Sequence, residues 1–456
     1  MNLLEDMNLL SNLFGKKKSV VTRFAPSPTG FLTIGNYRTA LFSYLFAKQH
    51  NGKFILRIED TDKERSKKEY DDDILESFKW LGLEYDELYR QSERSERHKE
   101  YLQKLIDSGF AYISKEKEVK EGGRAEVIRF KNPNKNVTFT DLIRGDITFN
   151  TEDLGDFVIA KSLDEPLFHL AVVADDFDMG ITHVIRGEDH ISNTPRQILI
   201  QEAIGASTPM YAHLPLILAP DKSKLSKRNG AVSIKDMKYQ GYVPEAIINF
   251  MALLGWNPGT DKEIYTFVEL LKDFNLSKIQ KGGAVFNQEK LNWVNKEHLR
   301  KLSVEKKLEH IQKYVKNIEI ERLKRAIEVI FERIETLDGL EQAFNDGEFS
   351  YLGNSIDYNP DLLLWKKEPS KGRTAERLKQ VAELIKKLPE LPTAEKTKET
   401  LWDFAEKEGR GEILWPLRAA LSGKEKSPDP FSLVEILGKT ESITRVQNAI
   451  LKLSNA

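Results

Sequence analysis

The 456-residue chain contains no cysteine. This absence excludes disulfide bonds, thiol nucleophiles and any zinc site with cysteine ligands. Proteins without disulfides are typical of reducing compartments, so we expect a cytoplasmic protein. Long apolar runs are absent as well, because no stretch reaches the roughly 18 apolar residues that a membrane-spanning helix needs. The first residues are polar and charged rather than signal-like, and we expect no membrane partner.

The chain also lacks an excess of charge of either sign. Its 69 basic and 71 acidic residues give a net charge of −2. A net charge this small gives no sign of a nucleic-acid partner, which would have to be bound by local basic patches. At about 150 residues per domain, the length predicts roughly three domains with ample cores.

The most informative stretch is SVVTRFAPSPTGFLTIG at residues 19–35. Its β-branched start predicts a strand, the prolines and glycine in its middle predict a tight loop, and a helical pattern begins near Asn36. The first N–H groups of a helix lack intrahelical acceptors, so such a helix start suits an anion. Taken alone, the stretch leaves two interpretations open, a phosphate site and a plain strand–helix connection.

The rest of the chain changes character twice. A second strand from Lys53 and a helix around 74–81 alternate, which favours a parallel, doubly wound sheet. Short strands between polar turns then predict a compact, mostly antiparallel insertion, with strands at 127–130, 137–139 and 147–149. The α/β pattern resumes with the apolar run 167–173 and the acids Asp175 and Asp176, and it continues through 181–204. From Tyr242 the pattern predicts helices to the end.

Three motifs occur in a fixed order: RFAPSPTG at 23–30, RIEDTD at 57–62 and KLSKR at 224–228. Together they resemble the signature of class I aminoacyl-tRNA synthetases, and their wording is similar to the bacterial glutamyl-tRNA synthetase family. The resemblance extends from about Val21 to PLRAALSGKEKSP at 416–428. It implies ATP-dependent ligation of L-glutamate to tRNA(Glu) through a glutamyl-adenylate. ATP, Mg²⁺ bound with ATP, and tRNA are the implied ligands, and a monomer is the family expectation.

The resemblance also implies an architecture. A Rossmann-like doubly wound parallel sheet carries a small inserted α+β domain and precedes an all-helical C-terminal anticodon-binding region. The expected parts are an N-terminal extension (1–18), the two halves of the catalytic domain (19–99 and 169–220), an inserted acceptor-end-binding domain (100–168), the KLSKR loop with a stem-contact domain (221–303), and the helical anticodon-binding region (304–456).

The implied reaction needs no covalent enzyme intermediate, so catalysis is positioning plus electrostatic stabilisation as pyrophosphate leaves. The resemblance makes Lys227 the main phosphate-stabilising residue. It assigns further catalytic roles to Lys224, Thr33 and Asn36. The implied ATP-binding residues are Gly35, Lys224, Ser226, Lys227 and Arg228. Arg418 is the implied tRNA-binding residue.

Glutamate recognition is assigned by the resemblance to Arg23, Ala25, Ser27, Glu59, Phe168 and Arg186. The chemistry fits, because Glu59 can accept hydrogen bonds from an ammonium group. Arg23 and Arg186 can hold a carboxylate through forked, charge-assisted bonds. For Arg186, the alternative is a structural salt bridge to Glu188 or Asp189.

The sequence departs from the family at several positions. Thr33 stands where the family has the first histidine of its HIGH-type motif, Phe168 replaces a tyrosine, and Asn229 replaces a frequent histidine. Losing one transition-state donor costs on the order of 10²–10³ in rate, so these departures put full catalytic strength in doubt. The insertion is shortened and has no cysteine, so we predict no zinc.

Other functions fit parts of the pattern. A glutaminyl-tRNA synthetase shares the core motifs, but that family ends in β-barrels whereas residues 300–456 predict helices. A weakened paralogue would bind tRNA or ATP without efficient charging, although Lys227 and Glu59 are intact. A non-discriminating enzyme would also charge tRNA(Gln), which depends on anticodon contacts that the pattern does not reveal.

Overall fold

A computed structural model of the chain describes residues 19–116, 125–225, 232–315, 318–366 and 370–455. The chain divides into two compact units, Met1–Val294 and Asn295–Ala456. Each unit has buried apolar residues of its own, such as Leu41 and Ile55 in the first and Val381 and Leu417 in the second.

The N-terminal unit is built on parallel strands. Strands β1, β2 and β3 lie in that order, and β10 pairs with β11. The N–H of Thr182, next to β10, donates to the carbonyl of Val21 in β1 at 3.0 Å, which brings the two groups together. The order β3–β2–β1–β10–β11 confirms the predicted doubly wound sheet. The strands are β1 (Val21–Phe24), β2 (Lys53–Ile58), β3 (Glu87–Arg90), β10 (His183–Gly187) and β11 (Met210–Leu214).

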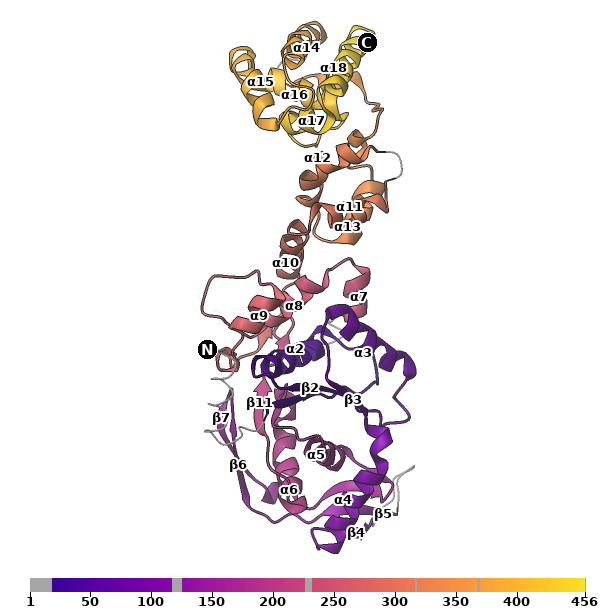
Figure 1. The fold of residues 1–456 in the computed structure, drawn as a ribbon, viewed down its shortest axis with the longest axis vertical. Helices are drawn as coiled ribbons and strands as arrows, with labels where there is room; N and C mark the ends of the chain where they lie inside the picture. Colours follow the sequence, from indigo (N-terminus) through magenta and orange to yellow (C-terminus); the bar gives the residue numbers. More distant parts are fainter. Residues whose placement is uncertain (1–18, 117–124, 226–231, 316–317, 367–369, 456) are drawn as a thin grey trace, which may run out of the picture. The chain divides into compact units, whose positions relative to one another are not determined.

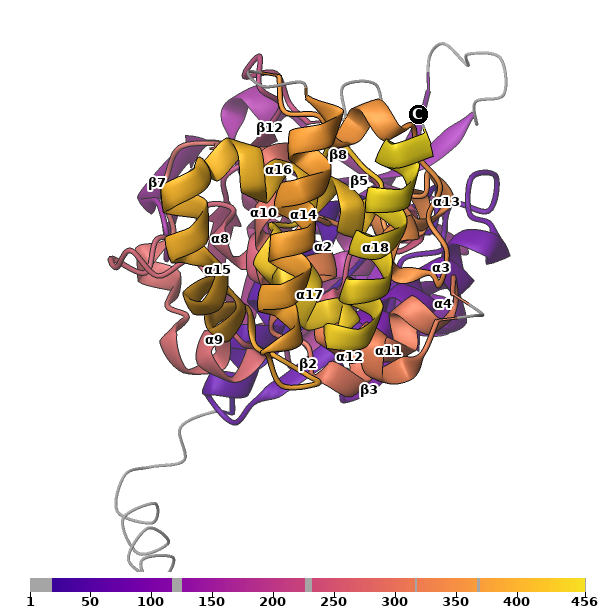
Figure 2. The same ribbon diagram turned by 90° about the horizontal axis from the view of Figure 1, so that it is seen from above.

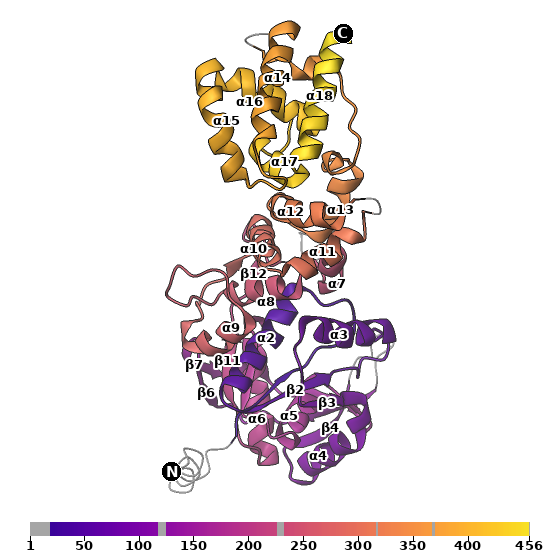
Figure 3. The ribbon, with the colours of Figure 1, turned by 45° about the horizontal axis from the view of Figure 1, so that its top comes forward.

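Helices cover both faces of these strands. In Figures 1 and 3, α2 (Ile34–Gln49) and α3 (Lys68–Leu81) lie on one side of β2 and β3, and α5 (Phe168–Asp178) and α6 (Thr194–Ile204) lie on the other. A strand covered on both faces needs a nearly continuous apolar run, and β2 provides one in FILRI, all of it buried.

The turn from α2 into β2 requires glycine at position 52. A Cβ there would lie 2.1 Å from the carbonyl oxygen of Val20. The close approach lets the N–H of Lys53 donate to that same carbonyl at 2.8 Å. Because this bond precedes the β1–β2 pairing, it helps to set the register in which Arg23 lies opposite Ile55.

The predicted antiparallel insertion is divided between two sheets. Strands β4, β5, β8 and β9 form one antiparallel sheet, packed against α4 (Ser95–Asp107). The β6–β7 hairpin instead extends the sheet of β10 and β11, with Asp141 of β6 opposite Tyr211 of β11. The strands are β4 (Ala111–Lys115), β5 (Glu126–Phe130), β6 (Asn136–Asp141), β7 (Gly145–Asn150), β8 (Phe157–Ser162) and β9 (Glu165–Pro166).

The remaining regular elements of the first unit are mostly helical. The described elements are β12 (Ile217–Leu218), α7 (Ile234–Tyr239), α8 (Pro244–Leu253), α9 (Phe267–Asp273), β13 (Ala284–Val285) and the start of α10 (Gln288–Arg300). The short β12–β13 pair is an exception to the prediction of helices alone after Tyr242.

The second unit is helical throughout its described part, as predicted. Figure 2 shows α14, α16 and α18 side by side, and α14 packs along α18. The helices are α11 (Val304–Gln312), α12 (Ile320–Phe331), α13 (Leu337–Asn345), α14 (Lys371–Lys386), α15 (Ala394–Glu408), α16 (Arg410–Ser422), α17 (Pro430–Leu437) and α18 (Lys439–Asn455). Across the described residues of both units, no helix combines the length and the apolar character needed to cross a bilayer.

Candidate active site

A cavity of about 600 Å³ lies at the carboxyl ends of β1 and β10. The strand order reverses between these two strands, which is where open α/β sheets bind ligands. Every described residue that we predicted for the site in this unit lines the cavity. They are Arg23, Ala25, Ser27, Thr33, Gly35, Asn36, Glu59, Phe168, Arg186 and Lys224.

The other predicted residues lie elsewhere. Ser226, Lys227, Arg228 and the neighbouring Asn229 fall outside the described residues. Arg418 belongs to α16 in the second unit, where its guanidinium lies 4.7 Å from the centre of the Trp415 ring.

The wall of the cavity near β1 and β2 is a buried ion network. The Arg57 side chain is fully buried, and its Nη1 donates to Oδ1 of Asp176 at 2.7 Å. Its Nη2 donates to Oε1 of Glu59 at 3.0 Å. Arg23 donates from Nε to Asp176 at 3.2 Å. One arginine and one aspartate therefore link the two cavity residues Arg23 and Glu59.

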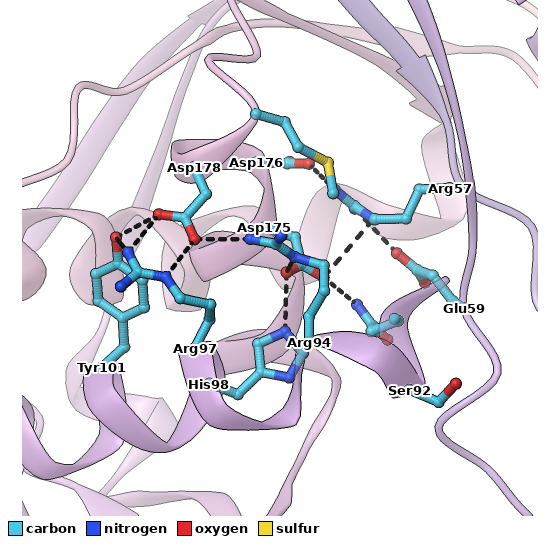
Figure 4. A network of polar contacts seen from close by, with 12 residues as sticks. Arg57, Glu59, Ser92, Arg94, Arg97, His98, Tyr101, Asp175, Asp176 and Asp178 are labelled. Atoms are coloured by element: carbon cyan, nitrogen blue, oxygen red, sulfur yellow. Dashed lines mark hydrogen bonds and ion pairs between the residues drawn. The ribbon is translucent and has the colours of Figure 1, made fainter. Parts of the chain in front are cut away.

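Figure 4 shows that this network continues along α5 from Asp176 to Asp175 and Asp178. Asp175, next to Asp176 on α5, accepts from Arg94 at 2.6 Å and bonds to Nε2 of His98 at 2.8 Å. Arg94 also donates to Asp178 at 2.6 Å. The acidic residues of α5 thus contact β1 and β2 through Asp176 and α4 through Asp175. These contacts hold α5 in place beside the cavity.

Burial affects the carboxylates of the network unequally. Removal from water would raise the pKa of Asp176, but Arg23 and Arg57 together hold it below its usual value. For Glu59, burial raises the pKa above its ordinary value although Arg57 opposes the shift. Glu59 is the carboxylate of this network with least compensation from protein cations. A cationic ligand in the cavity would supply that compensation.

Arg186, near the end of β10, carries a buried positive charge, whereas Glu59 carries a buried negative one. Its guanidinium donates at 2.7 Å to Oε1 of Gln197 and to Oγ1 of Thr194, and at 3.2 Å to Nε2 of His213. All three acceptors are neutral groups. Burial lowers the pKa of Arg186 to about 10, and among the described residues no carboxylate forms an ion pair with it.

The salt bridge considered as the alternative for Arg186 is not formed. Glu188 pairs instead with Arg144 and accepts from the N–H of Leu216 at 2.7 Å. Asp189 pairs with Nζ of Lys224 at 2.9 Å. A buried cation on the cavity wall with only neutral partners favours an anionic ligand.

The start of α2 forms the third side of the cavity. Thr33 is the N-cap residue, and its hydroxyl and N–H both donate to Oδ1 of Asn36, at 3.0 and 3.1 Å. A Cβ on Gly35 would meet only ordinary contacts, at 3.7 Å, so protein packing does not require glycine there. Since Gly35 lines the cavity, its missing side chain leaves room for a ligand at the helix N-terminus.

Segments near the KLSKR motif are anchored beside this helix. The backbone of Lys224 forms an isolated antiparallel β-bridge with Leu218, and the backbone of Ser233 forms one with Thr33. Arg38 of α2 is buried and donates to the carbonyls of Pro215 and Leu254. These contacts hold the loop after β11 against α2, so Lys224 and the helix start face the same cavity.

Sequence reasoning missed the residues that hold the cavity-lining side chains in place. Asp176 was visible as an acid after an apolar run, but its partners Arg23 and Arg57 lie 153 and 119 positions away. His213 is a single histidine in the buried strand MYAHL, a signal that an ordinary core histidine would also give. No local pattern identifies Thr194 or Gln197.

Comparison with known proteins identifies two families that match this chain. Residues 19–121 and 113–293 match the family described as tRNA synthetases class I (E and Q), catalytic domain, and residues 276–450 match the anticodon binding domain family. A glutamate–tRNA ligase of Aquifex aeolicus is 41% identical over 488 residues, covering 95% of this chain and 99% of the relative. One from Thermodesulfovibrio yellowstonii is 40% identical over 471 residues, covering 94% and 99%.

Solved structures include a similar protein. The crystal structure of a glutamate tRNA ligase from Elizabethkingia meningosepticum in complex with its amino acid has a TM-score of 0.82 at 33% identity, covering 96% of this chain and 100% of that chain. The family matches span most of the chain, and these relatives are matched over nearly their whole length. This chain therefore belongs to the class I tRNA synthetases of the glutamate and glutamine (E and Q) group.

Proposed function

We propose that the protein ligates L-glutamate to tRNA(Glu), using ATP to form a glutamyl-adenylate. The observation that carries the proposal is one cavity with a buried, uncompensated cation at Arg186 and an undercompensated carboxylate at Glu59. Both would be satisfied by one ligand with an ammonium and a carboxylate. The similar proteins described above are glutamate–tRNA ligases, which supports the same substrate.

In this proposal each charged group has one task. Glu59 accepts from the substrate ammonium, and Arg186 binds the side-chain carboxylate. Arg23 uses Nε and Nη2 toward Asp176, and Nη1 makes no hydrogen bond within the described residues, so Arg23 assists as the second cation. Phe168, Ala25 and Ser27 line the same cavity and shape the amino-acid pocket.

The start of α2 is the proposed phosphate site. Its orphan N–H groups, the space beside Gly35 and the cation of Lys224 fit the triphosphate of ATP. Lys227 is the proposed stabiliser of charge on the leaving pyrophosphate, helped by Ser226 and Arg228. When bound, Mg²⁺ would neutralise phosphate charge and would be held largely by ATP itself. Among described residues, the cavity carboxylates Glu59 and Asp189 already have protein cations as partners.

The remaining assignments extend the proposal to the whole chain. Arg418 of α16 would contact tRNA from the helical anticodon-binding region, which we place at 304–456. The segment 100–168 would bind the acceptor end, and 221–303 would contact the stem. A monomer in the cytoplasm is the proposed state.

The function is tested by charging purified tRNA with labelled glutamate in the presence of ATP and Mg²⁺. We expect retention of label on tRNA(Glu) well above a no-enzyme control. The assay contains tRNA throughout, because the family resemblance implies that activation requires it. A parallel assay with tRNA(Gln) decides whether the enzyme discriminates between the two tRNAs. Label that does not exceed the control with either tRNA would refute ligation.

Thr33→His is expected to raise kcat for charging by roughly tenfold or more. Histidine at the start of α2 adds a donor that can become charged near the phosphates, and one such donor is worth up to about 10²–10³ in rate. The threonine hydroxyl donates to Oδ1 of Asn36 at 3.0 Å and belongs to the capping box of α2, so its loss removes an N-cap contact. Steady-state kinetics would be compared with Thr33→Asn, which keeps a good N-cap without a charge. Equal rates for the two variants would mean that the pocket has adapted to threonine.

A further inference from the structure

Two buried residues that do not line the cavity are linked to Arg186 by hydrogen bonds. His213 on β11 is 0% exposed, and Asp141, the last residue of β6, is 1% exposed. Oδ2 of Asp141 lies 2.7 Å from Nδ1 of His213 and accepts from the backbone N–H of His213 at 2.9 Å. Oδ1 accepts from the N–H groups of Ile143 and Arg144 at 3.0 and 2.9 Å.

These contacts decide which ring nitrogen of His213 carries the proton. Asp141 is the acceptor in all four of these hydrogen bonds, because an ionised carboxylate has no hydrogen to donate. Nδ1 of His213 must therefore be the donor in its bond to Asp141. Burial lowers the pKa of His213, although Asp141 opposes the shift, and the ring is neutral at ordinary pH. A neutral ring protonated at Nδ1 has its lone pair on Nε2.

The lone pair on Nε2 faces the guanidinium of Arg186. Nε of Arg186 donates to it at 3.2 Å, while Nη1 and Nη2 donate to Gln197 and Thr194. If the proton of His213 were on Nε2 instead, two N–H groups would face each other at this distance. The orientation of the Arg186 fork therefore depends on Asp141 through His213.

We propose that Asp141 and His213 are positioning residues that fix the Arg186 fork, and thereby set the preference of the cavity for a carboxylate over an amide. The inference rests on the proposed role of Arg186 in glutamate recognition. A carboxylate accepts two forked bonds from a correctly turned guanidinium, whereas an amide offers one acceptor and an opposing NH₂ group. Rotation of the fork removes this advantage even though the charge stays in place.

The pair also joins two distant parts of the chain. Asp141 comes from the β6–β7 hairpin within the segment 100–168, and it lies opposite Tyr211 in the register of β6 and β11. The Tyr211 ring in turn lies 5.4 Å from the guanidinium carbon of Arg186. The inserted segment thus supplies a residue on which the amino-acid pocket depends.

Two substitutions at position 213 separate positioning from packing. His213→Gln can place an amide oxygen near the former Nε2 and so keep an acceptor for Arg186. His213→Asn keeps a donor toward Asp141 but cannot reach Arg186. We expect His213→Asn to raise the KM for glutamate and to lower the glutamate-to-glutamine ratio of kcat/KM, each by roughly 10-fold to 100-fold, as is typical of supporting residues. The KM for ATP should stay within about threefold.

His213→Gln should retain most of the wild-type ratio. Both variants remove the imidazole from the same buried site, but asparagine is smaller than glutamine by one methylene group, so the unfolding temperature of each variant is measured to account for lost packing. Equal ratios in the two variants, at matched unfolding temperatures, would overturn the proposal.

Asp141→Asn tests the tautomer directly. Its NH₂ group would face the two donors of His213 and favour protonation of the ring at Nε2, a change that ¹⁵N NMR of histidine-labelled protein reports without any assay of activity. We expect this variant to lower the glutamate-to-glutamine ratio as His213→Asn does. In the His213→Gln background the same substitution should have little further effect, because no ring tautomer remains. Additive effects would contradict the coupling.

Arg186→Ala, measured in the same assays, distinguishes the proposed recognition role of Arg186 from the positioning role of Asp141 and His213. If it leaves the glutamate-to-glutamine ratio unchanged, the proposed role of Arg186 is wrong, and the positioning role falls with it. If it abolishes the ratio while His213→Asn preserves it, only the positioning role is wrong.

Discussion

Arg186→Ala is expected to lower kcat/KM for glutamate by about 10²–10³. Removing one partner of a buried, charge-assisted contact costs roughly 2–5 kcal/mol, and each 1.4 kcal/mol is a factor of ten. The loss should fall mainly on glutamate, because glutamine gains little from a forked cation. The KM for ATP should change less than about threefold, since the proposed phosphate site is the start of α2. Charging kinetics with both amino acids measure these quantities.

Two further variants control this experiment. Arg196→Ala removes the same charge from α6, where Arg196 faces the Phe157 ring and does not line the cavity. We expect it to leave the glutamate-to-glutamine ratio unchanged. Arg186→Lys keeps the charge but loses the fork, and should fall between the wild type and alanine. An unchanged ratio in Arg186→Ala, with lowered stability, would make Arg186 a structural residue and leave recognition to Arg23.

Arg57→Met is expected to destabilise the N-terminal unit by about 3–5 kcal/mol, the usual cost of removing one member of a buried ion network. The Arg57 side chain is 0% exposed and bonds to Asp176 and Glu59, with Asp175 at 4.0 Å. Methionine fills part of the space, but the buried carboxylates of Asp176 and Glu59 lose a positive charge that offsets their own. Native-state hydrogen exchange of the β2 amides would measure the effect in this unit alone.

The destabilisation should depend on pH in a defined direction. In the wild type the folded-state pKa values of Asp175 and Asp176 lie below their ordinary value of 3.8, so these groups stabilise the fold above that pH. Without Arg57 both pKa values would rise, because one of the charges that lowers them is removed. The difference in stability from the wild type should therefore be largest near pH 7 and should shrink as the pH falls toward 3.8 and both proteins protonate these carboxylates.

A matched control lies on the same strand. Lys53→Met removes a cation that pairs with Glu87 at 2.8 Å, but the lysine side chain is 57% exposed. Exposed ion pairs contribute little to stability. The hydrogen-exchange rates of the β2 amides in Lys53→Met should therefore stay close to those of the wild type. If Arg57→Met were as mild as Lys53→Met, the network would not stabilise the unit.

Some features of this protein follow from local sequence alone. The apolar run of β2 and the spaced apolar residues of α3 predict a buried strand and an amphipathic helix, because the periodicity of each is set within a few residues. The proline- and glycine-rich loop before α2 likewise predicts a helix start that suits an anion. The three motifs, read in order, identified the family, and the residues predicted from that resemblance include some of those that line the cavity.

Other features depend on contacts between distant segments. The sequence predicted a strand pattern at 137–149 but not that this hairpin extends the sheet of β10 and β11, since no local period encodes which edge a strand joins. The partners of Arg186 show the same limit. Glu188 and Asp189 are its neighbours in sequence and carry the right charge, yet they pair with Arg144 and Lys224.

Local patterns and motif order were enough to predict most of the elements, the family and the chemical groups proposed for the site. Which of the buried charges are compensated depends on the tertiary structure. Asp176 of α5 forms ion pairs with both Arg23 of β1 and Arg57 of β2, whereas Arg186 is enclosed by neutral groups from α6 and β11. A buried charge needs a ligand when it is removed from water and no opposite charge lies beside it in the folded protein. Both conditions depend on contacts between distant segments, so they cannot be read from the local sequence.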